Sequence, residues 1–122
     1  MPDILIVDDD DQFRKMLKLL LEDEGYEVLE ASNGVEGIKI VHQHSTSLAI
    51  IDIFMPEKEG LETILELRRD APELKIIAIS GGGRQGILGF LEVAERFGAD
   101  KTLAKPFEPP QMISMVEELL AA

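Results

Sequence analysis

The chain has 122 residues, with 24 acidic against 12 basic side chains and a formal net charge of −12 at neutral pH. An acidic chain without a basic stripe cannot neutralise many phosphates, which argues against direct binding of nucleic acid. The absence of cysteine excludes a disulfide framework and thiolate metal sites. No apolar run approaches the roughly 18 residues that span a bilayer and no signal peptide is visible, so we expect a cytoplasmic protein without membrane contact.

Short apolar runs alternate with amphipathic helical patterns along the chain. The predicted strands cover residues 3–8, 26–30, 48–53, 74–79 and 101–105. The predicted helices cover residues 11–23, 34–43, 60–70, 86–97 and 109–121. Such alternation is typical of βαβ units built around a parallel sheet. Because the first, third and fourth strands are apolar on both faces, we expect helices to cover both sides of the sheet.

The first predicted helix carries an apolar stripe at three- and four-residue spacing, which should pack on the sheet. The stripe comprises Phe13, Met16, Leu17, Leu20 and Leu21. Leu19 lies off this stripe, on the side of Gln12 and Lys15. Glu24 and Gly25 should end the helix, with the glycine in the left-handed conformation.

Polar side chains stand at the ends of four predicted strands. Asp8 and Asp9 follow the first strand, Asp52 the third, Ser80 the fourth, and Lys105 closes the fifth. In a parallel sheet these ends meet at the carboxyl edge, where open α/β folds bind their ligands. Carboxylates together with a hydroxyl and an ammonium group suit a hard cation and a phosphoryl group.

We expect different roles for Asp8 to Asp11 and for Asp52. Four adjacent carboxylates repel one another unless a cation neutralises them, and Mg²⁺ typically takes one or two carboxylates with water and phosphate oxygens. We expect Asp9 to be the direct ligand with Asp8 as its neighbour, and Asp10 and Asp11 to cap the following helix. Asp52 can act as a nucleophile toward a phosphoryl donor, although a lone strand-end acid can equally be a helix cap.

A glycine-rich segment, residues 81–86, matches the G-x-G-x-x-G pattern of dinucleotide-binding folds. Such folds place this pattern after their first strand and an acid at the end of the next strand. Here the pattern follows the fourth strand, and the next strand ends in Lys105. We therefore interpret the segment as a loop, and note that Ser80 before it can cap the next helix.

Taken together, these motifs resemble the response-regulator receiver domain of two-component systems, over Asp3 to Ala122. The motifs that carry the resemblance are Asp8-Asp9, Asp52 with Met55-Pro56 and Gly60, Ser80, Gly98-Ala99, and Lys105-Pro106-Phe107. The resemblance implies a single receiver domain over residues 1–122. It also implies an α/β fold of the flavodoxin-like, doubly wound type, with five helices and a five-stranded parallel sheet in the order 2-1-3-4-5.

By this resemblance, Asp52 is the phosphoacceptor, and its donor is a phosphohistidine of a sensor histidine kinase or of a histidine phosphotransfer protein. Mg²⁺ would be bound by Asp9, Asp52 and the backbone carbonyl of Phe54, with Asp8 close by through water. Phe54 is apolar where many relatives carry a polar residue, which predicts slow loss of the phosphoryl group. The chain would not be an enzyme but a phosphoacceptor that promotes its own aspartyl phosphorylation and slow dephosphorylation.

The resemblance also implies a switch. Lys105 would contact the phosphoryl group, and Ser80 would move to hydrogen-bond it. The Lys105-Pro106 peptide bond is commonly cis in this family. Thr102 holds the switch position, where it is too small for an aromatic ring flip. Phosphorylation would thereby alter a surface that binds a downstream protein.

A docking face for the kinase is expected around the site. It comprises Gln12, Lys15 and Leu19 of the first predicted helix, with Pro106 and Phe107 nearby. These residues would surround Asp52, where a donor helix must approach.

Two other functions compete with this interpretation. A haloacid-dehalogenase-like aspartate phosphatase expects Asp-x-Asp at its nucleophile strand, and here the second position is Phe54. A phosphorylation-independent binding module would not require the set of Asp9, Asp52 and Lys105, which is intact. Both features favour the phosphoacceptor.

Overall fold

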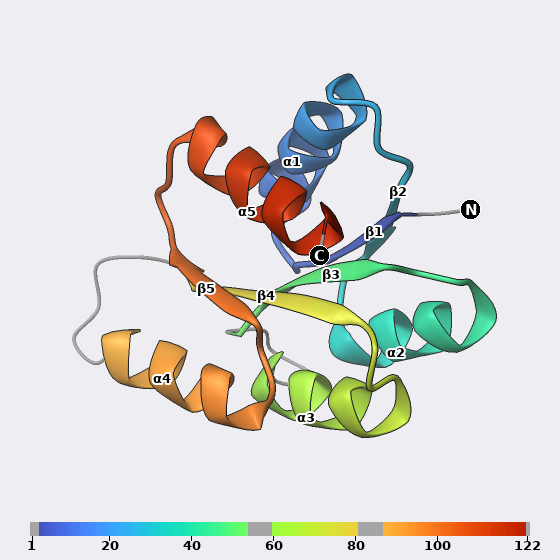
Figure 1. Ribbon diagram of the computed structural model, residues 1–122, viewed down its shortest axis with the longest axis vertical. Coiled ribbons are helices and arrows are strands. Elements are labelled where there is room, and N and C mark those ends of the chain that lie inside the picture. The colour runs from blue at the N-terminus through green and yellow to red at the C-terminus, as the bar shows by residue number, and fades with distance from the viewer. Residues whose placement is uncertain (1–2, 54–59, 81–86, 122) are drawn as a thin grey trace.

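Strands and helices alternate along the chain in the computed structural model, which describes residues 3–53, 60–80 and 87–121 (Figure 1). The strands are β1 (Ile4–Val7), β2 (Val28–Ala31), β3 (Leu48–Asp52), β4 (Lys75–Ser80) and β5 (Lys101–Ala104). The helices are α1 (Asp11–Asp23), α2 (Gly34–Gln43), α3 (Gly60–Asp70), α4 (Ile87–Phe97) and α5 (Pro109–Ala121).

The five strands form one parallel sheet in the order β2-β1-β3-β4-β5, which confirms the predicted fold. Strand β2 differs from its predicted range of 26–30 and begins later, at Val28. The reason is the end of α1, because the Tyr26 N–H donates to the carbonyl of Leu21 and so completes the helical turn. Gly25 in this turn has φ +97°, the left-handed conformation expected of it.

Helices cover both faces of the sheet, as predicted. Helices α1 and α5 lie on one face and α2, α3 and α4 on the other (Figure 1). Successive residues of β1 alternate between the two cores, since Leu5 belongs to the same core as Ile64 of α3 whereas Ile6 belongs to the same core as Leu17 of α1. The inner strands are apolar on both faces because both faces are buried.

Helix α1 departs from its predicted stripe at one position. Leu17 and Leu21 are fully buried, but Met16 is 55% exposed, so its expected packing on the sheet is wrong. The buried residues of α1 are Arg14, Leu17 and Leu21, at spacings of three and four residues, and they define its buried face. Since each residue advances about 100° around a helix, the Met16 side chain lies outside that buried face. Asp10 caps the helix as expected, accepting a hydrogen bond from the Phe13 N–H at 3.1 Å.

Both ends of the described chain lie at the amino edge of the sheet, opposite the strand ends that carry the polar residues. The carbonyl of Asp3, directly before β1, accepts hydrogen bonds from the Ser47 and Leu48 N–H groups. Residues 119 and 120 near the end of α5 line a groove of about 830 Å³ together with residues 41–47 and 71–75. The two ends of the described chain and this groove therefore lie at the same edge of the sheet.

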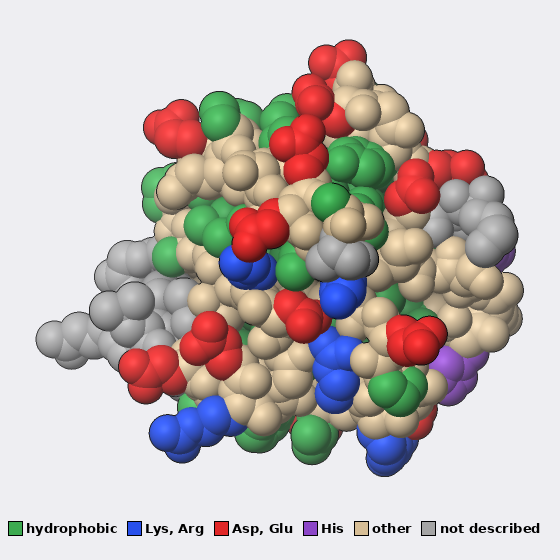
Figure 2. Space-filling model, viewed as in Figure 1, with side chains coloured by type: hydrophobic (Ala, Val, Ile, Leu, Met, Phe, Trp, Pro, Cys, Tyr) green, Lys and Arg blue, Asp and Glu red, His purple; other side chains and the backbone are tan. Residues whose placement is uncertain are grey.

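The acidic character of the chain is visible at its surface. Acidic side chains are spread over the face drawn in Figure 2, and basic side chains lie among them. Across the described residues, no helix combines the length and the apolar character needed to cross a membrane.

Candidate functional site

Three carboxylates meet at the carboxyl edge of the sheet. Asp8 directly follows β1 and Asp52 ends β3, and the pairing of Val7 with Ile51 sets the two acids side by side. One oxygen from each of Asp8, Asp9 and Asp52 lies within 4.8 Å of the others. Asp8 is fully buried and Asp52 is 5% exposed, whereas Asp9 is open to solvent.

The Lys105 ammonium reaches this acidic cluster from the end of β5. Its Nζ lies 2.9 Å from Asp8 Oδ2 and 3.6 Å from Asp52 Oδ2. The Lys105 N–H donates to the carbonyl of Ser80, which ties this residue to the end of β4. The peptide bond between Lys105 and Pro106 is cis, as the family resemblance predicted.

The donor set of the cluster fits a divalent cation. The three carboxylates carry more negative charge than the single Lys105 ammonium, which pairs with two of them, can neutralise. A divalent cation that prefers oxygen ligands would therefore lower the repulsion between the carboxylates. The other Asp8 oxygen already accepts a hydrogen bond from the Asp10 N–H at 2.9 Å, so both oxygens of Asp8 have polar partners within the protein. The backbone carbonyl of Phe54, also expected as a ligand, lies outside the described residues, as do the Met55-Pro56 turn and residues 81–86.

Ser80 and Thr102 lie on neighbouring strands beside the acids. Ser80 ends β4, is fully buried, and its hydroxyl has no hydrogen-bond partner among the residues that the structure describes. The residues that follow Ser80, 81–86, lie outside the described part of the chain, so the alternative that Ser80 caps the next helix stays a prediction. Thr102 pairs with Ala78 and is partly exposed, two positions before the partner of Ser80 on β5.

Arg14 is a buried cation beneath the acidic cluster that the sequence patterns did not single out. It is 8% exposed, and its Nη1 donates to the Asp8 carbonyl at 2.7 Å. Its Nε donates to Glu30 at 3.0 Å and its Nη2 to Asp11 at 2.6 Å. Arg14 thereby fixes the backbone that presents Asp8 to the site.

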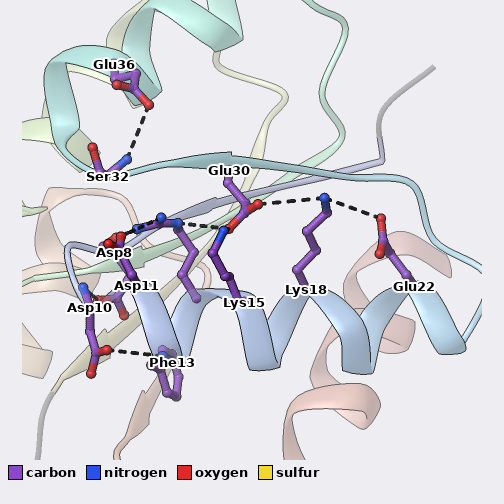
Figure 3. A network of polar contacts seen from close by, with 11 residues as sticks. Asp8, Asp10, Asp11, Phe13, Lys15, Lys18, Glu22, Glu30, Ser32 and Glu36 are labelled. Carbon is purple, nitrogen blue, oxygen red and sulfur yellow. Dashed lines mark hydrogen bonds and ion pairs between the residues drawn. The ribbon is translucent and has the colours of Figure 1, made fainter.

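The hydrogen bonds of Arg14 offset the unfavourable burial of its charge. Burial lowers the pKa of the guanidinium, but the bonds to Asp11 and Glu30 outweigh burial, and the pKa stands above its ordinary value. Glu30 on β2 also faces Lys15 and Lys18 of α1, so the helix and the edge strand are joined by a row of charges (Figure 3).

The expected docking residues are distributed around the site with unequal exposure. Leu19 is 68% exposed, and Gln12, Lys15 and Pro106 are also exposed. Phe107 is instead partly buried and belongs to the core beneath α1 and α5, so it offers less surface than expected.

Fold and site together define a doubly wound α/β domain with carboxylates and one lysine gathered at the carboxyl edge of its sheet. The family model of the response regulator receiver domain matches residues 4–117, and the chain belongs to this family, whose members act in two-component systems.

Its relatives include transcriptional regulators and separate receiver domains. The chain is 34% identical over 120 residues to the transcriptional regulatory protein SrrA of Staphylococcus aureus, covering 97% of this chain. It spans about half the length of these curated relatives, 47% of SrrA. The crystal structure of the NtrX receiver domain from Brucella abortus matches with a TM-score of 0.91 at 30% identity, covering 98% of this chain and 99% of that one. A CheY-like receiver domain protein from Methanospirillum hungatei matches with a TM-score of 0.91 at 32% identity, covering 99% and 94%.

Proposed function

We propose that residues 1–122 form one receiver domain that takes a phosphoryl group onto Asp52 from a phosphohistidine of a sensor histidine kinase or of a histidine phosphotransfer protein. The observation that carries the proposal is the setting of Asp52, a nearly buried carboxylate beside two further carboxylates and an ammonium group. A carboxylate can serve as nucleophile toward a phosphoryl donor. Membership of the receiver family supports the same role.

In the proposed reaction, a carboxylate oxygen of Asp52 attacks phosphorus. The oxygen–phosphorus bond forms while the nitrogen–phosphorus bond of the donor breaks, and the electron pair stays on the imidazole nitrogen, which takes up a proton from solvent. Lys105, 3.6 Å from Asp52, is placed to pair with a phosphoryl oxygen as its negative charge arrives. The chain would thus be a phosphoacceptor that promotes its own modification and its slow loss.

We propose that Asp9 and Asp52 ligate Mg²⁺ and that Asp8 contacts the ion through water. When bound, Mg²⁺ supplies positive charge that offsets repulsion between a carboxylate and an incoming phosphoryl group. The oxygen donors and the excess of negative charge at this edge support the assignment.

We propose that Ser80 and Thr102 transmit the conformational change that follows phosphorylation of Asp52. The buried Ser80 hydroxyl is assigned the hydrogen bond to the phosphoryl group, and Thr102 the adjoining switch position. Their places on the adjacent strands β4 and β5 support a coupled rearrangement that alters a surface for a downstream protein.

Phosphorylation by a small donor tests the function directly. With phosphoramidate and Mg²⁺, the intact protein should gain the mass of one phosphoryl group, and chelation of the metal with EDTA should prevent the gain. Borohydride reduction of the acyl phosphate should mark Asp52. A protein that gains no mass would be a binding module of another kind, and a mark on another residue would remove Asp52 from its role.

The docking face is proposed as the part of the surface that selects the phosphohistidine donor. Because Leu19 is exposed beside Lys15 on α1, a glutamate at position 19 should leave the fold intact but place a charge in the contact with the donor. Leu19→Glu should slow phosphotransfer from the cognate kinase at least about tenfold, a typical effect at a central interface residue.

The matched control is Leu65→Glu, since Leu65 of α3 is also an exposed leucine, at 53%, on the opposite face of the sheet. This variant should accept the phosphoryl group from the kinase at the rate of the unaltered protein, and both variants should react normally with phosphoramidate. Equal slowing by the two substitutions would contradict a docking role for α1.

A further inference from the structure

The Lys105 ammonium contacts an aromatic ring in addition to the carboxylates. Its Nζ lies 3.9 Å from the centroid of the Phe13 ring, on the ring face. The Lys105 side chain is only 16% exposed, so the contact lies in a largely dehydrated setting. A cation over an aromatic face is attracted by the negative charge of the π system, most strongly where water is excluded.

The Phe13 ring is itself held in place from two sides. Its backbone N–H donates to the capping carboxylate of Asp10, which fixes the start of α1 (Figure 3). The Phe107 ring packs edge-on against the Phe13 ring, with centroids 5.9 Å apart and planes at 84°. Edge-to-face packing of this kind is a favoured geometry for aromatic pairs, so the plane of the Phe13 ring is defined.

We propose that Phe13 is a positioning residue that holds the Lys105 ammonium over the carboxylates of Asp8 and Asp52, with Phe107 fixing the plane of its ring. The inference rests on the proposed function, since it assigns Phe13 a part in the acceptance of the phosphoryl group by Asp52. From its spacing in the sequence, Phe13 is expected only to belong to the apolar stripe of α1.

A ring suits this position better than another acid. An ammonium group has three N–H donors, and a third carboxylate would compete for them with Asp8, Asp52 and the incoming phosphoryl oxygen. The ring face attracts the charge without accepting a directional hydrogen bond from it. Phe13 therefore restricts where the ammonium lies while leaving its donors available to oxygen atoms.

Fluorination of the ring tests this role without altering the fold. Incorporation of 4-fluoro- and then 3,4,5-trifluorophenylalanine at position 13 withdraws charge from the ring face and leaves the side chain close to its natural size. The rate of phosphorylation by phosphoramidate with Mg²⁺ should fall stepwise, by about threefold to tenfold for the trifluoro ring. The same residues at Phe97, in the core on the other side of the sheet, should have no effect.

A double-mutant cycle provides the second test. Phe13→Leu should slow phosphorylation about threefold to tenfold in the native background and should have no further effect in a Lys105→Met background, because the cation is then gone. Phe13→Tyr, which keeps the ring, should restore the native rate. A purely structural role for Phe13 would instead give the same slowing in both backgrounds.

The outcomes separate this inference from the function on which it rests. If the unaltered protein takes up no phosphoryl group, the proposed function fails. If the unaltered protein is phosphorylated but the fluorinated rings at position 13 react at the native rate, the function stands and the positioning role of Phe13 is overturned.

Discussion

Replacing Asp52 by Asn is expected to abolish phosphorylation while leaving the fold at least as stable as before. An amide is not a nucleophile toward phosphorus, so phosphoramidate should add no mass to the variant. In the absence of Mg²⁺ the substitution also removes one of three mutually repelling carboxylates from a nearly buried cluster. We expect a gain in the free energy of unfolding on the order of 1 kcal/mol, reduced by the loss of the contact with Lys105.

Thermal unfolding with and without Mg²⁺ completes this prediction. An ion that binds only the folded state stabilises the unaltered protein by about 2.7 kcal/mol when present at a hundred times its dissociation constant. Asp52→Asn should lose most of this gain. Glu92→Gln, which neutralises an exposed acid of α4, should keep both the gain and the phosphorylation. Loss of phosphorylation together with a less stable fold would indicate unfolding and not loss of the nucleophile.

Gly60→Ala is expected to destabilise the protein severely. A Cβ added to Gly60 would overlap the backbone carbonyl oxygen of Asp52 and the Cα of Ile53, and neither backbone atom can rotate away. Alanine is favoured over glycine in a helix by about 1 kcal/mol, but overpacking against backbone costs about 3 kcal/mol or more, so the clash decides the sign. The melting temperature should fall by more than about 10 °C.

Gly25→Ala is the control for this variant. Gly25 has open space around its Cα but a φ of +97°, so alanine there costs only the left-handed strain of about 1–2 kcal/mol. Phosphorylation of the folded Gly25→Ala protein should be normal. Equal melting temperatures for the two variants would show that the backbone near Asp52 yields to the added methyl group. The tight fit at Gly60 also explains physically why a glycine opens the helix that follows β3.

The sheet and the acidic cluster were predictable from the sequence because each depends on a short-range pattern. Runs such as residues 48–52 are apolar throughout, as strands buried on both faces must be. Polar residues at the ends of parallel strands meet at one edge of the sheet, so the sequence alone predicts that Asp8, Asp52 and Lys105 lie close together, as they do.

The unpredicted features depend on contacts between distant segments. Arg14 of α1 has the spacing of a buried position relative to Leu17 and Leu21. A charged residue is tolerated there because Asp11, the Asp8 carbonyl and Glu30 of the distant strand β2 all accept hydrogen bonds from it. The lone acid Glu30 in the short apolar strand at residues 28–31 is a signal from which a basic partner could have been predicted. The contact of Phe13 with Lys105 joins residues 92 positions apart in the sequence, and the spacing pattern around either residue does not predict it.

The shared position of the two chain ends has a consequence for how this unit can be combined with others. Asp3 and the last turn of α5 both lie at the amino edge of the sheet, across the length of the strands from Asp52. A reporter protein or a second domain joined at either end would attach away from the chemistry, leaving the acidic edge open to a donor. A change at Asp52 could reach such an attached unit only along the sheet or its covering helices. The same placement of the chain ends therefore keeps an attached unit clear of the site and makes any coupling between the two long-range.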